Sequence, residues 1–168
     1  MPRIALLSCR SAAILAGVAA QLVWSSQARA QSTGVLNARV RVVRALRVAG
    51  TGNLRFGNIA PTSSKTVAPA AGGRFRIRGA PGQAVSLTFT LPANLGNPAV
   101  AIGAWTGLVH TRNTPGAATA FVPSAAPQTR TLHAVSGRLF VWIGATVTTT
   151  GAPVGNYSAP VRLTVVYN

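Results

Sequence analysis

The sequence predicts an all-β fold, a sandwich of about seven strands. Short runs alternate between apolar and polar residues along most of the chain after residue 30, and such alternation is typical of half-buried strands. Gly, Pro and Asn interrupt these runs, as expected of turns. No stretch has a convincing helical period, and no longer internal repeat is visible. Several short strands with regular turns favour two sheets packed face to face.

Residues 1–30 precede this pattern and have the features of a secretory signal peptide. A start that carries arginines leads into an apolar run over residues 11–24, and the small residues Ala28 and Ala30 follow. A positive start, an apolar centre and an A-x-A site define such a signal, and the run is short for a transmembrane helix. We expect cleavage after Ala30 and a single β-sandwich domain over residues 31–168, with no transmembrane segment. The domain would then lie in the periplasm, at the cell surface or outside the cell.

The first predicted strand spans Leu36–Val48. Its apolar residues lie on one side, whereas Arg39, Arg41 and Arg47 lie on the other. Arg44 breaks the alternation, which indicates a bulge or a bend beside it. The apolar positions at the start of this strand are also a candidate assembly strand for insertion into another subunit: Leu36, Ala38, Val40 and Val42. The alternative is that they belong to the first strand of a complete sandwich.

The middle of the chain contains the clearest alternation. Gly52 and Asn53 predict a turn, and Pro61–Lys65 a loop. Arg74–Arg78 predicts a strand with Phe75 and Ile77 facing inward. A type II turn at Ala80–Gln83, with Pro second and Gly third, leads into a strand over residues 85–91.

The last third predicts three strands and one long connection. Residues 92–98 predict a loop, Val100–Val109 a weaker strand, and Thr111–Thr129 a long irregular loop or an edge. Leu139–Val147 follows as a strand whose opposite face carries Phe140 and Trp142. The last predicted strand spans Tyr157–Tyr167.

The charge balance excludes several classes of function. The chain has 16 Lys plus Arg and no Asp or Glu. Carboxylate sites for Mg²⁺ or Ca²⁺, glycosidase carboxylate pairs and a Ser-His-Asp triad are therefore excluded. His110 and His133, even with Lys65, assemble no visible catalytic or metal site. We expect a protein that is not an enzyme and has no cofactor and no metal. Cys9 lies in the expected signal, so no disulfide is expected in the mature domain.

The arginines are the candidate anion-binding residues. Arg74, Arg76 and Arg78 alternate along one strand and would form a ladder on one sheet face, spaced by roughly 7 Å. Arg39 and Arg41 would extend it if their strand is a neighbour. Guanidinium groups match phosphate, sulfate and carboxylate groups, but a solvated sheet face is the alternative. Specific nucleic-acid recognition is not expected, because stacking aromatics do not alternate with the arginines on that face.

Five segments, in order, resemble an exported bacterial family known as domain of unknown function 4402. The first has the pattern L-x-F-G-x-I-x-P, the second is a strand followed by Gly-x-Pro-Gly, and the third is a strand that ends in Leu-Pro. The fourth is an apolar stretch ending in Gly-Ala-Thr, and the fifth a G-x-Y…V-x-Y-N ending. These segments are Leu54–Pro61, Phe75–Gly82, Val85–Pro92, Phe140–Thr146 and Gly155–Asn168.

The family is similar to spore-coat-U-like and pilus subunits, so the resemblance implies an immunoglobulin-like, pilin-like sandwich. It also implies a secreted structural or surface subunit, fimbria-like in form, that associates with itself or with sister subunits. The alternative left open is a monomeric envelope module. Such a module would bind polyanions, namely lipopolysaccharide, acidic polysaccharide or nucleic acid, through its arginine-rich faces.

Overall fold

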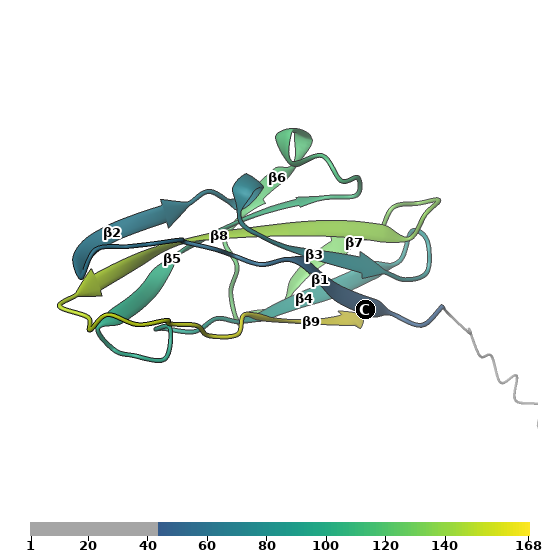
Figure 1. Ribbon diagram of the computed structural model, residues 1–168. Coiled ribbons are helices and arrows are strands. Elements are labelled where there is room, and N and C mark those ends of the chain that lie inside the picture. Colours follow the sequence, from purple (N-terminus) through teal and green to yellow (C-terminus); the bar gives the residue numbers. More distant parts are fainter. Residues whose placement is uncertain (1–43) are drawn as a thin grey trace, which may run out of the picture. The chain divides into compact units, whose positions relative to one another are not determined.

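The protein is an all-β sandwich of two antiparallel sheets, as the sequence predicts (Figure 1). The structure, a computed structural model, describes residues 44–168. Within that range there are nine strands and two single-turn 3₁₀ helices. The strands are β1 (Arg47–Gly52), β2 (Thr62–Val67), β3 (Gly73–Arg78), β4 (Ala84–Thr90), β5 (Val100–His110), β6 (Thr119–Phe121), β7 (Gln128–Thr131), β8 (Arg138–Thr150) and β9 (Arg162–Tyr167), and the helices are η1 (Pro69–Ala71) and η2 (Pro115–Ala117).

The two sheets differ in size. The large sheet has the order β1-β3-β8-β5-β6, and β2 also pairs with β8, beyond the end of β3. The small sheet has the order β7-β4-β9. None of the described helices is long and apolar enough to cross a membrane.

The main core lies between the sheets, where the predicted alternation is confirmed. Ile77 of β3 and every second residue of β4 and β8 point inward and are buried. The predicted turn at Ala80–Gln83 is also confirmed, because Gln83 N–H donates to Ala80 C=O at 3.4 Å and Gly82 has φ +67°. The buried members of this core are Ile77, Val85, Leu87, Phe89, Val109, Leu132, Leu139, Val141 and Ile143.

The weak alternation in Val100–Val109 has a structural cause. A register shift between Gly103 and Thr106 interrupts the pairing of β5 with β8, and Ala104 has φ +45°. Such a bulge adds a residue and switches the side chains that face the core. Val100 therefore faces inward on one side of the shift, and Val109 on the other. The sequence shows two short patterns instead of one.

The prediction of a loop at Pro61–Lys65 is wrong from Thr62 onward. Thr62–Val67 is strand β2 and pairs with the last six residues of β8. Its cross-strand contacts are between hydroxyl groups, such as Thr66 Oγ1 to Thr146 Oγ1 at 2.8 Å. Because both partner strands carry hydroxyl residues there, no apolar alternation marks the strand. Strands β2, β6 and β7 were not predicted, and they raise the number above the predicted seven.

The ends of the predicted strands also need correction. Residues 36–43 of the first predicted strand lie outside the described residues, and β1 begins at Arg47 and continues into the predicted turn at Gly52. Val48 is 38% exposed instead of inward-facing, because β1 is the edge of the large sheet and pairs only with β3. The predicted loop Thr111–Thr129 is interrupted by η2 and β6, and its last two residues belong to β7.

The two longest strands of the large sheet, β5 and β8, are longer than any strand of the small sheet. β8 has 13 residues and β4 has 7, which correspond to about 43 and 23 Å of extended chain. The small sheet therefore covers only the part of β8 that begins at Arg138. Figure 1 shows β5 and β8 continuing past β4 and β9. A second cluster lies on this uncovered part: Val100, Ile102, Ala145, Val147 and Ala152.

Candidate functional site

Four residues of the second cluster form the apolar floor of a groove with a volume of about 710 Å³: Val100, Ile102, Val147 and Ala152. One wall is the segment 54–61, between β1 and β2. The other wall is the segment 152–161, between β8 and β9. No strand of the small sheet reaches this floor, because the partly buried residues that pack on it come from the loops and from β5. Here two irregular segments replace a second sheet.

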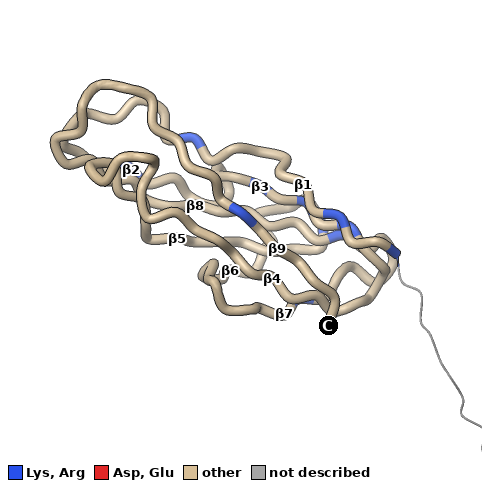
Figure 2. The backbone as a smooth tube through the Cα atoms, turned by 90° about the horizontal axis from the view of Figure 1, so that it is seen from below, with Lys and Arg blue, Asp and Glu red and all other residues tan. Residues whose placement is uncertain are grey.

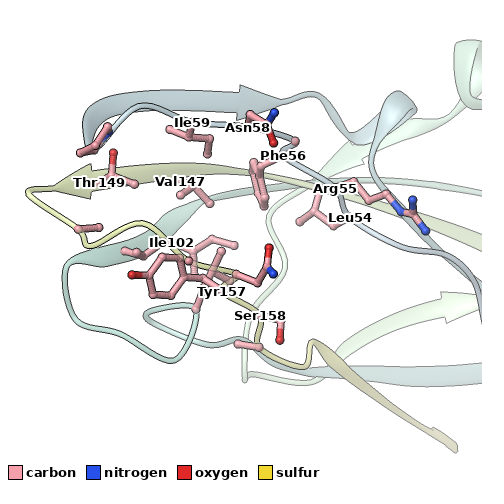
Figure 3. Close-up of a pocket in the computed structure, with 18 of the residues that line it drawn as sticks. Leu54, Arg55, Phe56, Asn58, Ile59, Ile102, Val147, Thr149, Tyr157 and Ser158 are labelled. Carbon is pink, nitrogen blue, oxygen red and sulfur yellow. The ribbon is translucent and has the colours of Figure 1, made fainter.

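The first wall is the segment with the pattern L-x-F-G-x-I-x-P. Leu54, Phe56 and Ile59 are half-buried and pack on the floor, whereas Arg55 is exposed. Gly57 has φ +66°, a backbone conformation that favours glycine. Figure 3 shows Phe56 and Ile59 in the upper part of the groove with Val147, and Ile102 lower, near Tyr157. The spacing of the motif therefore places three apolar side chains on one side of the segment.

The end of this wall is fixed by the side chain of Thr149, which is only 7% exposed. Its Oγ1 lies 2.7 Å from Ala60 O and accepts a hydrogen bond from Ser63 N–H at 3.0 Å. Ala152 N–H donates to Pro61 C=O at 3.3 Å. These contacts close one end of the groove.

The second wall carries Tyr157 and an exposed apolar rim. The Tyr157 hydroxyl donates to Pro153 C=O at 2.6 Å, and its ring faces the groove (Figure 3). Val154, on the rim, is 99% exposed. The prediction of one strand over Tyr157–Tyr167 is wrong for its first five residues, since β9 begins at Arg162. β4 ends where β9 begins to pair, so residues 157–161 alternate without a partner strand.

The two walls scarcely bond to each other. Among the described residues, the contact between Ala152 and Pro61 is the one backbone hydrogen bond that joins them. An apolar floor between two such backbones is the geometry that an added extended segment uses: main-chain bonds hold it, and alternate side chains fill the pockets below.

The arginines of the predicted ladder lie in different environments. Arg74, Arg76 and Arg78 point away from the core residues Phe75 and Ile77, as predicted. Arg74 is engaged, because its Nε donates to Thr51 Oγ1 at 3.0 Å and its Nη1 to Asn113 Oδ1 at 3.3 Å. Arg39 and Arg41 lie outside the described residues, as do the expected cleavage residues Ala28 and Ala30 and the candidate assembly residues Leu36, Ala38, Val40 and Val42.

A second pocket, of about 360 Å³, brings together arginines that the sequence pattern did not group. Arg47, Arg78 and Arg138 stand directly opposite one another on β1, β3 and β8. Arg44, Ser136 and the Gly79 turn complete its lining, together with Ala45. Figure 2 shows the arginines gathered around β1 and β3, near the C-terminus. We call this set the arginine pocket.

The other candidate side chains serve the fold. His110 Nδ1 accepts a hydrogen bond from Arg112 N–H at 3.0 Å, and His133 Nδ1 accepts from Val135 and Ser136 N–H at 3.2 and 3.1 Å. Each ring therefore caps its own loop. No group of three possible metal-ligating side chains occurs among the described residues. Trp142 is 3% exposed and stacks on Phe140 at 6.2 Å, so it is not free to stack on a base.

The comparisons with known proteins identify no family. No family model and no curated protein matches the chain. Among solved structures, the chain is similar to a chain of a chaperone-usher pilus. The two share 13% sequence identity and a TM-score of 0.36, over 82% of this chain and 97% of the pilus chain.

Proposed function

We propose that the protein is an exported, non-enzymatic structural subunit of the cell surface, fimbria-like in its assembly. In this proposal the groove receives an extended segment of a sister subunit. The observation that carries the proposal is the groove above the second cluster on the large sheet, which two loops that scarcely bond to each other cover in place of a strand. The histidine rings support a non-enzymatic role, because both are engaged in capping loops.

The first candidate for the inserted segment is Leu36–Val42 of another copy. Leu36, Ala38, Val40 and Val42 alternate with polar residues, as a strand does when only one of its faces is buried. Seven extended residues span roughly 23 Å, and Ala145–Thr150 of β8, which runs along the groove floor, spans roughly 20 Å. The length and the pattern of the segment therefore both suit the groove. The alternative is that these residues complete the chain's own sandwich.

The decisive experiment examines a sheared cell-surface fraction on a denaturing gel, with and without boiling. Strand-linked subunits would give a ladder that collapses to one band on boiling. A single band before boiling, or no signal outside the cell, would contradict the proposal.

Two pairs of variants locate the contact. Ala159→Trp fills the groove from its second wall, whereas Ala101→Trp places the same ring on an exposed position outside it. On the donor side, Val40→Asn puts an amide on the face expected to be buried, and Val43→Asn puts it on the other face. Ala159→Trp and Val40→Asn should abolish the ladder, and their controls should keep it. If all four variants assemble alike, the groove is not the contact.

A further inference from the structure

The arginine pocket is a concentration of positive charge that no acidic side chain of the chain offsets. Cross-strand neighbours lie about 4.5–5.5 Å apart at Cβ, and like charges in such positions destabilise a sheet. The row Arg47–Arg78–Arg138 places three of them side by side, and Arg44 approaches from the segment before β1. Since the chain contains no Asp or Glu, no acidic side chain of another copy can neutralise them either.

The guanidinium groups of the pocket are free to bind. Among the described residues, the arginines whose guanidinium groups donate to protein acceptors are Arg74, to Thr51 and Asn113, and Arg130, to Thr129. Arg130 also lies over the ring of Phe121, 5.6 Å from its centroid. The arginines of the pocket have no comparable contact. The sheet holds their Cα positions, and the donors remain available.

The electrostatics agree with the geometry. The neighbouring cations Arg76 and, next, Arg138 lower the pKa of the Arg78 guanidinium. An anion at this place would relieve that repulsion. The pocket has about the volume of twelve waters at ~30 Å³ each, so it has room for more than one small oxyanion.

We propose that the arginine pocket binds phosphate, as a phosphate monoester or a pyrophosphate group. A guanidinium group can donate two parallel hydrogen bonds to two oxygens of one phosphate group. A phosphate group that carries about two negative charges has enough oxygens for several guanidinium groups at once, whereas a carboxylate has one charge and two oxygens. The Ser136 hydroxyl adds a neutral donor at the rim. This inference does not depend on the proposed function, because the pocket lies at the other end of β8 from the groove.

The test titrates the full domain with inorganic pyrophosphate and inorganic phosphate at low salt, by calorimetry. Sulfate and acetate serve as comparison anions. Pyrophosphate should bind most tightly and acetate not measurably. Arg78→Gln and Arg138→Gln should each weaken pyrophosphate binding about tenfold or more, the value of one charge-assisted hydrogen bond. Arg78→Lys keeps the charge but loses the paired hydrogen-bond donors of the guanidinium group, so it should also weaken binding.

The matched control is Arg162→Gln, which removes one charge from an exposed position of β9 outside the pocket. If Arg162→Gln weakens binding as much as Arg138→Gln does, the attraction is a general effect of net charge and the proposal is wrong. Absence of pyrophosphate binding by the unmodified protein also overturns it. Thermal midpoints of the variants, measured without anion, verify that they fold.

A second experiment, with lipid vesicles, identifies the kind of molecule that carries the phosphate group. Vesicles of phosphatidylcholine with and without phosphatidic acid present the same monoester on a membrane surface. If the protein is retained on the vesicles with phosphatidic acid and inorganic pyrophosphate releases it, the pocket accepts a lipid headgroup. Binding of pyrophosphate without retention on vesicles would assign the site to a soluble or saccharide-linked phosphate.

Discussion

At one end of β8, loops instead of a second sheet cover the apolar side chains, and at the other end arginines lie side by side with no acidic side chain near them. Val147 and Thr149 line the groove, Arg138 lines the arginine pocket, and roughly 36 Å of extended strand separates the two ends. A partner would supply apolar side chains and backbone hydrogen bonds to the first end, and a few oxygens to the second. The two proposed sites would therefore lie apart on one domain and would rely on different chemistry.

Apolar burial at one end of β8 and repulsion between arginines at the other differ in energy and in their response to salt. Apolar burial is worth about 25 cal/mol per Å² and hardly depends on ionic strength. Repulsion between exposed arginines is small and is screened within about 10 Å at 0.1 M salt. Changes to the apolar core should therefore have the larger effects on folding, and changes to the arginine pocket the smaller, salt-dependent ones.

The largest expected effect comes from a comparison of Leu87→Ala with Leu54→Ala. Leu87 is fully buried between the sheets, whereas Leu54 is half-buried at the open groove. Truncation should cost about 2–5 kcal/mol at Leu87, but only about 1 kcal/mol at Leu54, where part of the side chain already contacts water. Urea unfolding of the monomer measures both. Equal losses would mean that the groove is already filled.

The next largest effect is a gain of stability at the end of β8 that carries the arginine pocket. Arg138→Glu places a carboxylate directly opposite Arg78 and ends a like-charge contact. The thermal midpoint should rise by about 1–4 °C, the effect of a favourable cross-strand pair. Arg162→Glu changes the net charge equally and faces Thr90 instead, so its midpoint should change less. A larger gain for the control would show that repulsion is not concentrated in the pocket.

The strands of the main core could be predicted from the sequence, because their successive residues point alternately toward the core and away from it. Phe75 and Ile77 of β3, and Leu139 to Val147 of β8, were predicted on their correct sides. The type II turn followed from Pro81 and Gly82. These features depend on neighbours along the chain, so local sequence is sufficient to find them.

The candidate sites depend on distant residues, which is why the sequence showed them only in part. Tyr157 begins an alternating run, but whether that run is a strand depends on where β4 ends. Arg47 and Arg138 are neighbours only through the register of both strands with β3. The pattern therefore suggested a ladder along one strand, whereas the densest set of arginines crosses three strands.

Salt should produce a smaller effect than either substitution, and only at one end. Raising sodium chloride from about 0.02 to 0.5 M shortens the screening length to a few ångström. The thermal midpoint of the unmodified protein should rise by about a degree or two. Arg138→Gln should reduce this rise, whereas Leu54→Ala should leave it unchanged. If Leu54→Ala reduces the rise as much, the salt acts on apolar burial rather than on the arginine pocket.

The smallest expected effect is the response to acid, because neither end of β8 contains a carboxylate side chain. Acid unfolding of most proteins follows the protonation of carboxylates that are ionised in the folded state. With no Asp and no Glu in the chain, the free energy of unfolding should change little between about pH 5 and pH 3, where such groups titrate. Urea unfolding curves at these two pH values, at constant ionic strength, provide the measurement. Glu introduced at Arg138 is the internal control, because stability gained from that carboxylate should disappear as the pH falls through its pKa. A collapse of the unmodified protein in the same interval would mean that the fold depends on a carboxylate other than an Asp or Glu side chain, either the terminal one or one bound from outside the chain.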